Sequence, residues 1–161
     1  MSKGIVRVYY GEGHGKSTAA LGTAVREASH GKNATVISFL KEKSEDSEEL
    51  LKKLEPELKF FRFEKSESSF AELSEEEKEK EMMNLRMGYN YGKKVISTGG
   101  CDLAVLDEVL DLIREEIITE KELVELLENV PEDMVVICTG RYVPDCVKEC
   151  ADELYQVTLE K

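Results

Sequence analysis

The stretch VYYGEGHGKSTAALGTAVREASHGKN, residues 8–33, decides the fold. It passes from an apolar run into a turn with glycine at every second position, and then into a segment rich in alanine. This order predicts a strand, a glycine-rich turn and a helix that ends before His30 and Gly31. Glycines in such a turn let consecutive N–H groups point toward one anion, and the helix N-terminus adds its dipole. The stretch therefore predicts a phosphate-binding loop.

The loop departs from the strict pattern G-x-x-x-x-G-K-[ST], which places glycine where this chain has Tyr10. We expect loop amides and the Lys16 ammonium to bind phosphate oxygens, and the Ser17 hydroxyl to bind Mg²⁺. A turn with a purely structural role is the alternative. The candidate nucleotide-binding residues of the loop are Gly11, Glu12, Gly13, His14, Gly15, Lys16, Ser17 and Thr18.

Two more predicted strands end in polar residues. LAVLDE, residues 103–108, runs into Asp107 and Glu108, and VVICTGR, residues 135–141, delivers Arg141. Because ligands bind at the carboxyl ends of parallel strands, these side chains should face the loop. Ser17, Asp107 and Glu108 are the candidate metal ligands, and Arg141 suits an anionic group. The alternative for Asp107 is that it caps the following helix.

Composition narrows the class of protein. The 161 residues, 41% hydrophobic, predict a single domain spanning 1–161. The net charge of −12 argues against a nucleic-acid surface. No apolar run is long enough to cross a membrane, and a cytoplasmic location is expected. The acidic segment 64–81 is interpreted as a solvated helix face with its preceding loop. The four cysteines show no C-x-x-C spacing and are interpreted as reduced, buried side chains. The alternative for Cys146 and Cys150, one helical turn apart, is a pair of thiol ligands.

Strand and helix patterns alternate along the chain. Strands are predicted at 4–10, 34–40, 58–63, 102–107, 134–139 and 154–159. Helices are predicted at 16–29, 47–54, 74–95, 111–129 and 143–153, with the fourth either continuous or broken near Thr119. Ser74 and Glu77 form a capping-box pattern at the start of the third. This alternation indicates an α/β fold with a mostly parallel sheet of about six strands.

At this point the sequence resembles the P-loop ATP:corrinoid adenosyltransferases. The resemblance rests on YGEGHGKSTAALGTAVR with HGKN and VISFLK after it, on LDE at 106–108 and on TGR at 139–141. That family also lacks the first Walker glycine. Its pattern places an arginine ten residues after the lysine, here Arg26, and a lysine after the second strand, here Lys41. The resemblance implies a three-layer α/β/α fold of the P-loop NTPase type.

The resemblance also implies the chemistry. Reduced Co(I) of a corrinoid attacks the 5′ carbon of ATP, and triphosphate leaves. Lys16 and Glu108 are then the candidate catalytic residues. ATP is the co-substrate, with Mg²⁺ or Mn²⁺ as metal. A homodimer and an electron donor for Co(II) reduction are expected. The family places aromatic residues against the lower corrin face, and the available ones here are Phe60, Phe61, Phe63, Phe70 and Tyr89.

The chain departs from the family pattern at several points. Glu12 replaces asparagine, His14 replaces lysine, and Tyr10 replaces a small residue. The chain has no tryptophan, and it ends without the family's usual C-terminal tail. Two other functions therefore stay open: a P-loop ATPase or small-molecule kinase, and a relative that binds ATP or a corrinoid without turnover.

Overall fold

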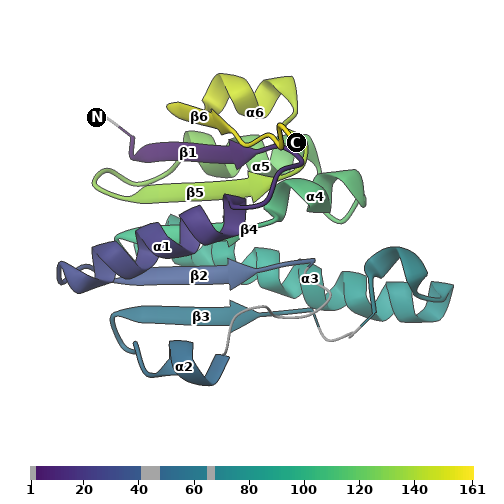
Figure 1. Ribbon diagram of the computed structural model, residues 1–161, viewed down its shortest axis with the longest axis horizontal. Helices are drawn as coiled ribbons and strands as arrows, with labels where there is room; N and C mark the ends of the chain where they lie inside the picture. Colours follow the sequence, from purple (N-terminus) through teal and green to yellow (C-terminus); the bar gives the residue numbers. More distant parts are fainter. Residues whose placement is uncertain (1–2, 41–47, 65–67) are drawn as a thin grey trace.

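The computed structural model describes residues 3–40, 48–64 and 68–161. Within them, six parallel strands form one sheet in the order β3-β2-β4-β5-β1-β6 (Figure 1). The predicted α/β class and strand number are confirmed. The strands are β1 (Ile5–Tyr10), β2 (Ala34–Ser38), β3 (Leu58–Arg62), β4 (Leu103–Asp107), β5 (Val135–Gly140) and β6 (Glu153–Gln156).

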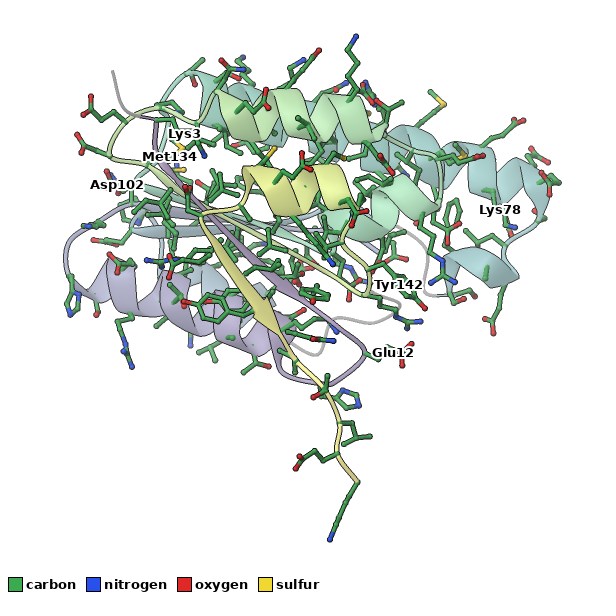
Figure 2. The ribbon with its side chains drawn as sticks, turned by 90° about the horizontal axis from the view of Figure 1, so that it is seen from above. Lys3, Glu12, Lys78, Asp102, Met134 and Tyr142 are labelled. Atoms are coloured by element: carbon green, nitrogen blue, oxygen red, sulfur yellow. The ribbon has the colours of Figure 1, made fainter. Side chains whose placement is uncertain are left out.

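Helices cover both faces of the sheet and make three layers. Helix α1 (Lys16–Ser29) lies on one face. The opposite face carries α3 (Glu75–Ser97), α4 (Val109–Arg114), α5 (Glu120–Glu128) and α6 (Asp145–Cys150), as Figures 1 and 2 show. The short α2 (Glu48–Lys52) packs beside β3, and a 3₁₀ turn, η1 (Phe70–Glu72), precedes α3.

The central strands are apolar on both sides because both sides are covered. In β4, Leu103 and Val105 pack in a core cluster with the alanines of α1, whereas Ala104 and Leu106 join the larger core on the opposite face. Successive strand side chains point to opposite faces, so a buried central strand needs a continuous apolar run. This is the pattern that the sequence showed.

Helix starts follow local capping. Ser74 accepts a hydrogen bond from the Glu77 amide, and the Glu77 side chain accepts one from the Ser74 amide, which confirms the predicted capping box. A second box joins Thr119 and Glu122 at the start of α5. The predicted helix at 111–129 is therefore two helices, and the first begins at Val109.

Other boundaries differ from the predictions. The predicted last helix, 143–153, is shorter: α6 ends at Cys150, and Glu153 already belongs to β6. The strand ends at Gln156, three residues before the predicted limit. The acidic segment is not solvated throughout, since Glu64 and Glu81 are buried although residues 75–77 are exposed. At the ends of α6 and β6, polar and apolar residues follow one another without a clear period. The local sequence pattern alone therefore placed these boundaries wrongly.

The cysteines are free thiols; Cys101 and Cys138 are buried, whereas Cys146 and Cys150 are only partly covered. Across the described ranges, no helix has both the length and the apolar composition that a membrane crossing requires.

Candidate functional site

The strand order brings three separate loops to one place. Strand β1 pairs with β5, and β5 pairs with β4, all in parallel, so their carboxyl ends meet at one edge of the sheet. The register sets Tyr10 beside Gly140 and Leu106 beside Cys138. Residues 11–15, 107–108 and 139–141 therefore lie around one place, and the sequence predicted that these three strand ends converge there.

The glycine-rich loop has the backbone needed to expose its amides. Gly11 and Gly15 have φ angles of 126° and 111°, which favour glycine. Gly15 is the N-cap of α1 and supplies no side-chain cap. The first N–H groups of a helix have no partner within it, so these amides and the helix dipole favour an anion. The Lys16 ammonium bridges the loop by donating to the carbonyl oxygens of Gly11 and Gly13.

A hydrogen-bonded chain ties the loop to the ends of β4 and β5. The hydroxyls of Ser17 and Thr139 both donate to Asp107 Oδ1, at 2.8 and 2.7 Å. The Thr139 hydroxyl in turn accepts from the Glu108 amide at 2.7 Å. Asp107 is 5% exposed and Thr139 is fully buried. The network fixes both carboxylate-bearing residues against the loop.

The capping alternative for Asp107 is wrong. The N-cap position of α4 is Glu108, whose φ of 67° is left-handed and whose side chain does not cap the helix. A non-glycine residue in this region carries local strain, which is common at functional sites. The turn directs the Glu108 side chain toward the cavity that it lines.

The site opens into a cavity of about 740 Å³. Its ionisable lining includes four carboxylates and three permanent cations. The lining residues are Glu12, Gly13, His14, Gly15, Lys16, Ser17, Thr18, Leu40, Ser69, Phe70, Ala71, Glu108, Asp111, Arg114, Glu115 and Arg141. A mixed charge of this kind suits a polyphosphate that arrives with a cation.

Most predicted site residues line this cavity, whereas Gly11, Asp107 and Arg26 are not part of its lining. Gly11 and Asp107 are bonded to Lys16 and Ser17, which do line it. Arg26 is exposed near the far end of α1, about 15 Å along the helix from Lys16 at 1.5 Å per residue. Its assignment stays a prediction. Lys41 lies outside the described residues. Tyr10, which replaces the first Walker glycine, is half-buried under the Lys148 ammonium, 5.7 Å from its ring centre, and does not line the cavity.

The sequence analysis missed Asp111 and Arg114. Asp111 Oδ1 accepts from the Arg141 amide at 3.3 Å, and burial raises the pKa of Asp111 against the lowering effect of that amide. The Arg114 guanidinium lies 5.2 Å from the ring centre of Tyr142. Their spacing of three and six residues after Glu108 puts them on one helix face. That spacing was the available signal.

The described residues contain no group of three or more His, Cys, Asp and Glu side chains arranged to hold a metal ion. The oxygens of Ser17, Asp107 and Glu108 are nevertheless the hard donors that Mg²⁺ prefers. Mg²⁺ commonly takes one or two protein ligands and completes its shell with phosphate and water. The donor set therefore fits a metal that binds together with a nucleotide.

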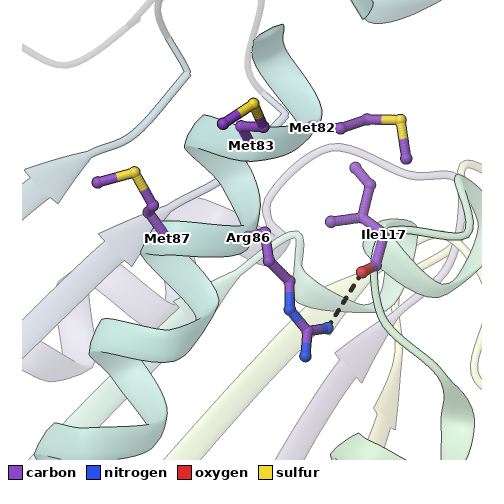
Figure 3. Close-up of a pocket in the computed structure, with 5 residues that line it drawn as sticks. All are labelled: Met82, Met83, Arg86, Met87 and Ile117. Atoms are coloured by element: carbon purple, nitrogen blue, oxygen red, sulfur yellow. Dashed lines mark hydrogen bonds between the residues drawn. The ribbon is translucent and has the colours of Figure 1, made fainter. Parts of the chain in front are cut away.

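A second cavity, of about 380 Å³, lies against α3. Figure 3 shows its lining, in which Arg86 donates to the Ile117 carbonyl at 3.2 Å. The remaining lining residues are three methionines, Met82, Met83 and Met87. None of the predicted site residues lines this cavity, so it is separate from the phosphate loop.

Comparisons with known proteins give the family of the chain. Residues 2–161 match the model of the family described as ATP:corrinoid adenosyltransferase BtuR/CobO/CobP. The chain is 30% identical over 155 residues to corrinoid adenosyltransferase of Escherichia coli K12, covering 96% of this chain and 76% of that protein. Corrinoid adenosyltransferase CobA of Salmonella typhimurium gives the same identity and coverage. Corrinoid adenosyltransferase of Pseudomonas aeruginosa is 23% identical over 165 residues, covering 99% and 77%.

Proposed function

Because this chain belongs to the ATP:corrinoid adenosyltransferase family, we propose that the 740 Å³ cavity is where it performs that family's reaction. The enzyme transfers the 5′-deoxyadenosyl group of ATP to Co(I) of a corrinoid. The Co(I) electron pair forms the new Co–C bond, and the C5′–O bond breaks. Its electron pair leaves with triphosphate.

The observation that carries the assignment is the hydrogen bond of 2.8 Å between Ser17 and Asp107. It joins the first turn of α1 to the end of β4, so the loop amides and the carboxylates act on one ligand. In our proposal the triphosphate binds these amides, and Lys16 leaves the Gly11 and Gly13 carbonyls to contact it. Stabilising this leaving group is the main electrostatic task of the site.

Ser17, Asp107 and Glu108 would hold the Mg²⁺ that accompanies ATP. When bound, the ion supplies positive charge to the phosphate oxygens. The chain's own contribution is orientation, because Thr139 fixes both the Asp107 carboxylate and the Glu108 amide. Arg141 and Arg114 add charge at the cavity wall. Attack at carbon needs no activated water, so no general base is assigned.

Phe70 is the aromatic residue best situated to face the corrinoid. It packs against the core and also lines the cavity with Ser69 and Ala71, whereas none of the other aromatic candidates lines it. Phe61 and Phe63 contact the Tyr91 ring, at centroid distances of 5.0 and 6.1 Å. Tyr89 is buried, and Phe60 packs on the α1 side of the sheet. An apolar wall at Phe70 would exclude water from the reacting cobalt and carbon.

Two further features of the proposal come from the family resemblance alone. We propose that an electron donor reduces Co(II) and that the enzyme acts as a homodimer. Arg26 and Lys41 are proposed as nucleotide contacts on the same ground. A cytoplasmic location is proposed from the composition of the chain.

The experiment is anaerobic incubation with ATP, Mg²⁺ and chemically reduced cob(I)alamin, followed by absorbance for adenosylcobalamin. The wild-type protein should form the light-sensitive product and inorganic triphosphate. Lys16→Ala should be inactive. Lys32→Ala is the matched control, because Lys32 is an exposed lysine that pairs with Glu27 at the other end of α1.

The products of this incubation distinguish an adenosyltransferase from the two alternative functions. ADP or a phosphorylated product would identify an ATPase or kinase. ATP binding without conversion of the corrinoid would favour a protein that delivers or senses it. Full activity of Lys16→Ala would move the site away from the loop.

A further inference from the structure

The chain after β6 runs directly beside the phosphate loop. The Val157 amide donates to the Tyr10 carbonyl at 2.8 Å, which continues the pairing of β6 with β1 by one residue. The Val157 carbonyl then accepts from the Gly13 amide at 3.3 Å. Figure 2 shows this yellow segment crossing the loop next to Glu12. One residue of the C-terminal segment is thus bonded on both sides of the loop's first turn.

This segment explains two of the loop glycines. A Cβ atom on Gly11 would lie 2.1 Å from the Val157 carbonyl oxygen. A Cβ on Gly13 would lie 3.0 Å from Val157 Cγ1, and 3.2 and 3.3 Å from the Thr158 backbone. By contrast, a Cβ on Gly15 would meet nothing within 4 Å. Gly15 is needed for its φ, whereas Gly13 is needed for the space that residues 157–158 occupy.

We propose that residues 157–158 are a positioning segment of the ATP site. They form the outer wall of the loop and hold its first turn, so that the amides from Gly15 onward face the cavity. Three glycines in five residues make a free loop costly to order. A wall that orders the loop before ATP arrives removes that cost from binding. The inference rests on the proposed function, since it assumes that this loop binds the triphosphate.

Two roles for residues 157–158, positioning the loop for ATP or only extending the edge strand, predict different results when these residues are deleted. The far end of β6 is held independently, because Arg7 pairs with Glu153 at 2.6 Å and the Tyr9 and Tyr155 rings stack at 5.0 Å. Loss of residues 157 onward should therefore leave the fold intact. It should raise KM for ATP, because the loop must then be ordered on binding, and change kcat less. If the segment had a purely structural role, its deletion would lower thermal stability without raising KM more than it changes kcat.

The decisive experiment is a double-mutant cycle between Gly13→Ala and deletion from Val157 onward. In the full chain, Gly13→Ala should raise the calorimetric Kd for Mg-ATP about tenfold, which corresponds to about 1.4 kcal/mol, because the added methyl group overpacks the contact. In the shortened chain the same substitution should change Kd less than about twofold, because the obstructing atoms are absent. Gly13 does not have a positive φ, so alanine is otherwise tolerated there.

Two controls complete the design. Deletion from Leu159 onward keeps the wall and should leave Kd within about twofold of wild type. Gly15→Ala should raise Kd by the same factor in both chains, because no atom lies within 4 Å of its Cβ position. Equal effects of Gly13→Ala in the two chains would overturn the inference. If the intact wild-type protein bound no ATP, the proposed function itself would be wrong. Thermal melts of every variant identify any variant that does not fold.

Discussion

Replacement of Thr139 by valine should separate the carboxylate network from the packing around it. The Thr139 side chain is fully buried. Its hydroxyl donates to Asp107 Oδ1 and accepts from the Glu108 amide, each at 2.7 Å. Valine keeps the shape and the methyl group but makes neither bond. Asp107 is only 5% exposed, and a lost hydrogen bond at such a buried position is costly.

The magnitude follows from these two bonds. A bond to a charged carboxylate contributes about 1.5 to 3 kcal/mol, and a neutral bond contributes about 1 kcal/mol. Relaxation of Asp107 toward Ser17 recovers part of the loss, so we expect destabilisation of about 2 to 3 kcal/mol. For a chain of this size each kcal/mol lowers the melting temperature by about 2 to 4 °C. Thr139→Val should therefore melt about 5 to 10 °C below wild type.

Calorimetric titration with ATP then tests the functional part. Without the Thr139 hydroxyl, the Glu108 turn is held less firmly, so half-maximal ATP binding should need about tenfold more Mg²⁺, which corresponds to about 1.4 kcal/mol. Thr139→Ser is the matched control, since it keeps the hydroxyl and loses only the methyl group. The reasoning is refuted if the valine variant melts within 2 °C of wild type, or if the serine variant shows the greater requirement for Mg²⁺.

Three further predictions concern packing, charge and thiol reactivity. Gly140→Ala should destabilise the fold by about 1 to 3 kcal/mol in urea titrations, because its Cβ would lie 2.4 Å from Leu110 Cβ. Hydrogen bonds from Arg86 lower the pKa of Glu122 from 4.5 to about 2. That pair stabilises the fold fully above pH 4.5 and loses its effect as pH falls toward 2. Glu122→Gln should therefore be less stable than wild type at pH 7, by about 1 kcal/mol for a partly exposed pair, and nearly equal to it near pH 2. Burial raises the pKa of the Cys138 thiol to about 12, so mass spectrometry should find it unmodified by a thiol reagent until the protein unfolds.

Local signals in the sequence were sufficient for much of this structure. The loop and α1 were predicted at their observed bounds, because the glycines, the alanine-rich periodicity and the stop at His30 are all short-range features. The box of Ser74 and Glu77 likewise depends on residues three apart. The convergence of 107–108 and 139–141 on the loop followed from a general property of parallel sheets, in which strand ends share an edge.

Long-range contacts could not be predicted in the same way. Nothing local to Gly13 shows that its neighbour is Val157, because the contact depends on β6 pairing with β1 across the whole chain. The predicted strand at 154–159 even continued through this position, and the structure ends it at Gln156. Asp111 was missed for a related reason. Its hydrogen-bond partner is the amide of Arg141, which lies 30 residues later in the sequence.

The charge of the chain explains why the loop relies on its backbone. A protein of net charge −12 repels ATP at a distance, and the cavity itself carries more carboxylates than permanent cations. Backbone amides can attract phosphate despite this excess of carboxylates, because they supply partial positive charge at fixed positions without adding a titratable group. Their usefulness depends entirely on orientation, since a misdirected amide contributes nothing. In the proposed ATP site, the contacts that fix the loop, at Gly140 on one side and Val157 on the other, should therefore contribute to nucleotide binding alongside Lys16.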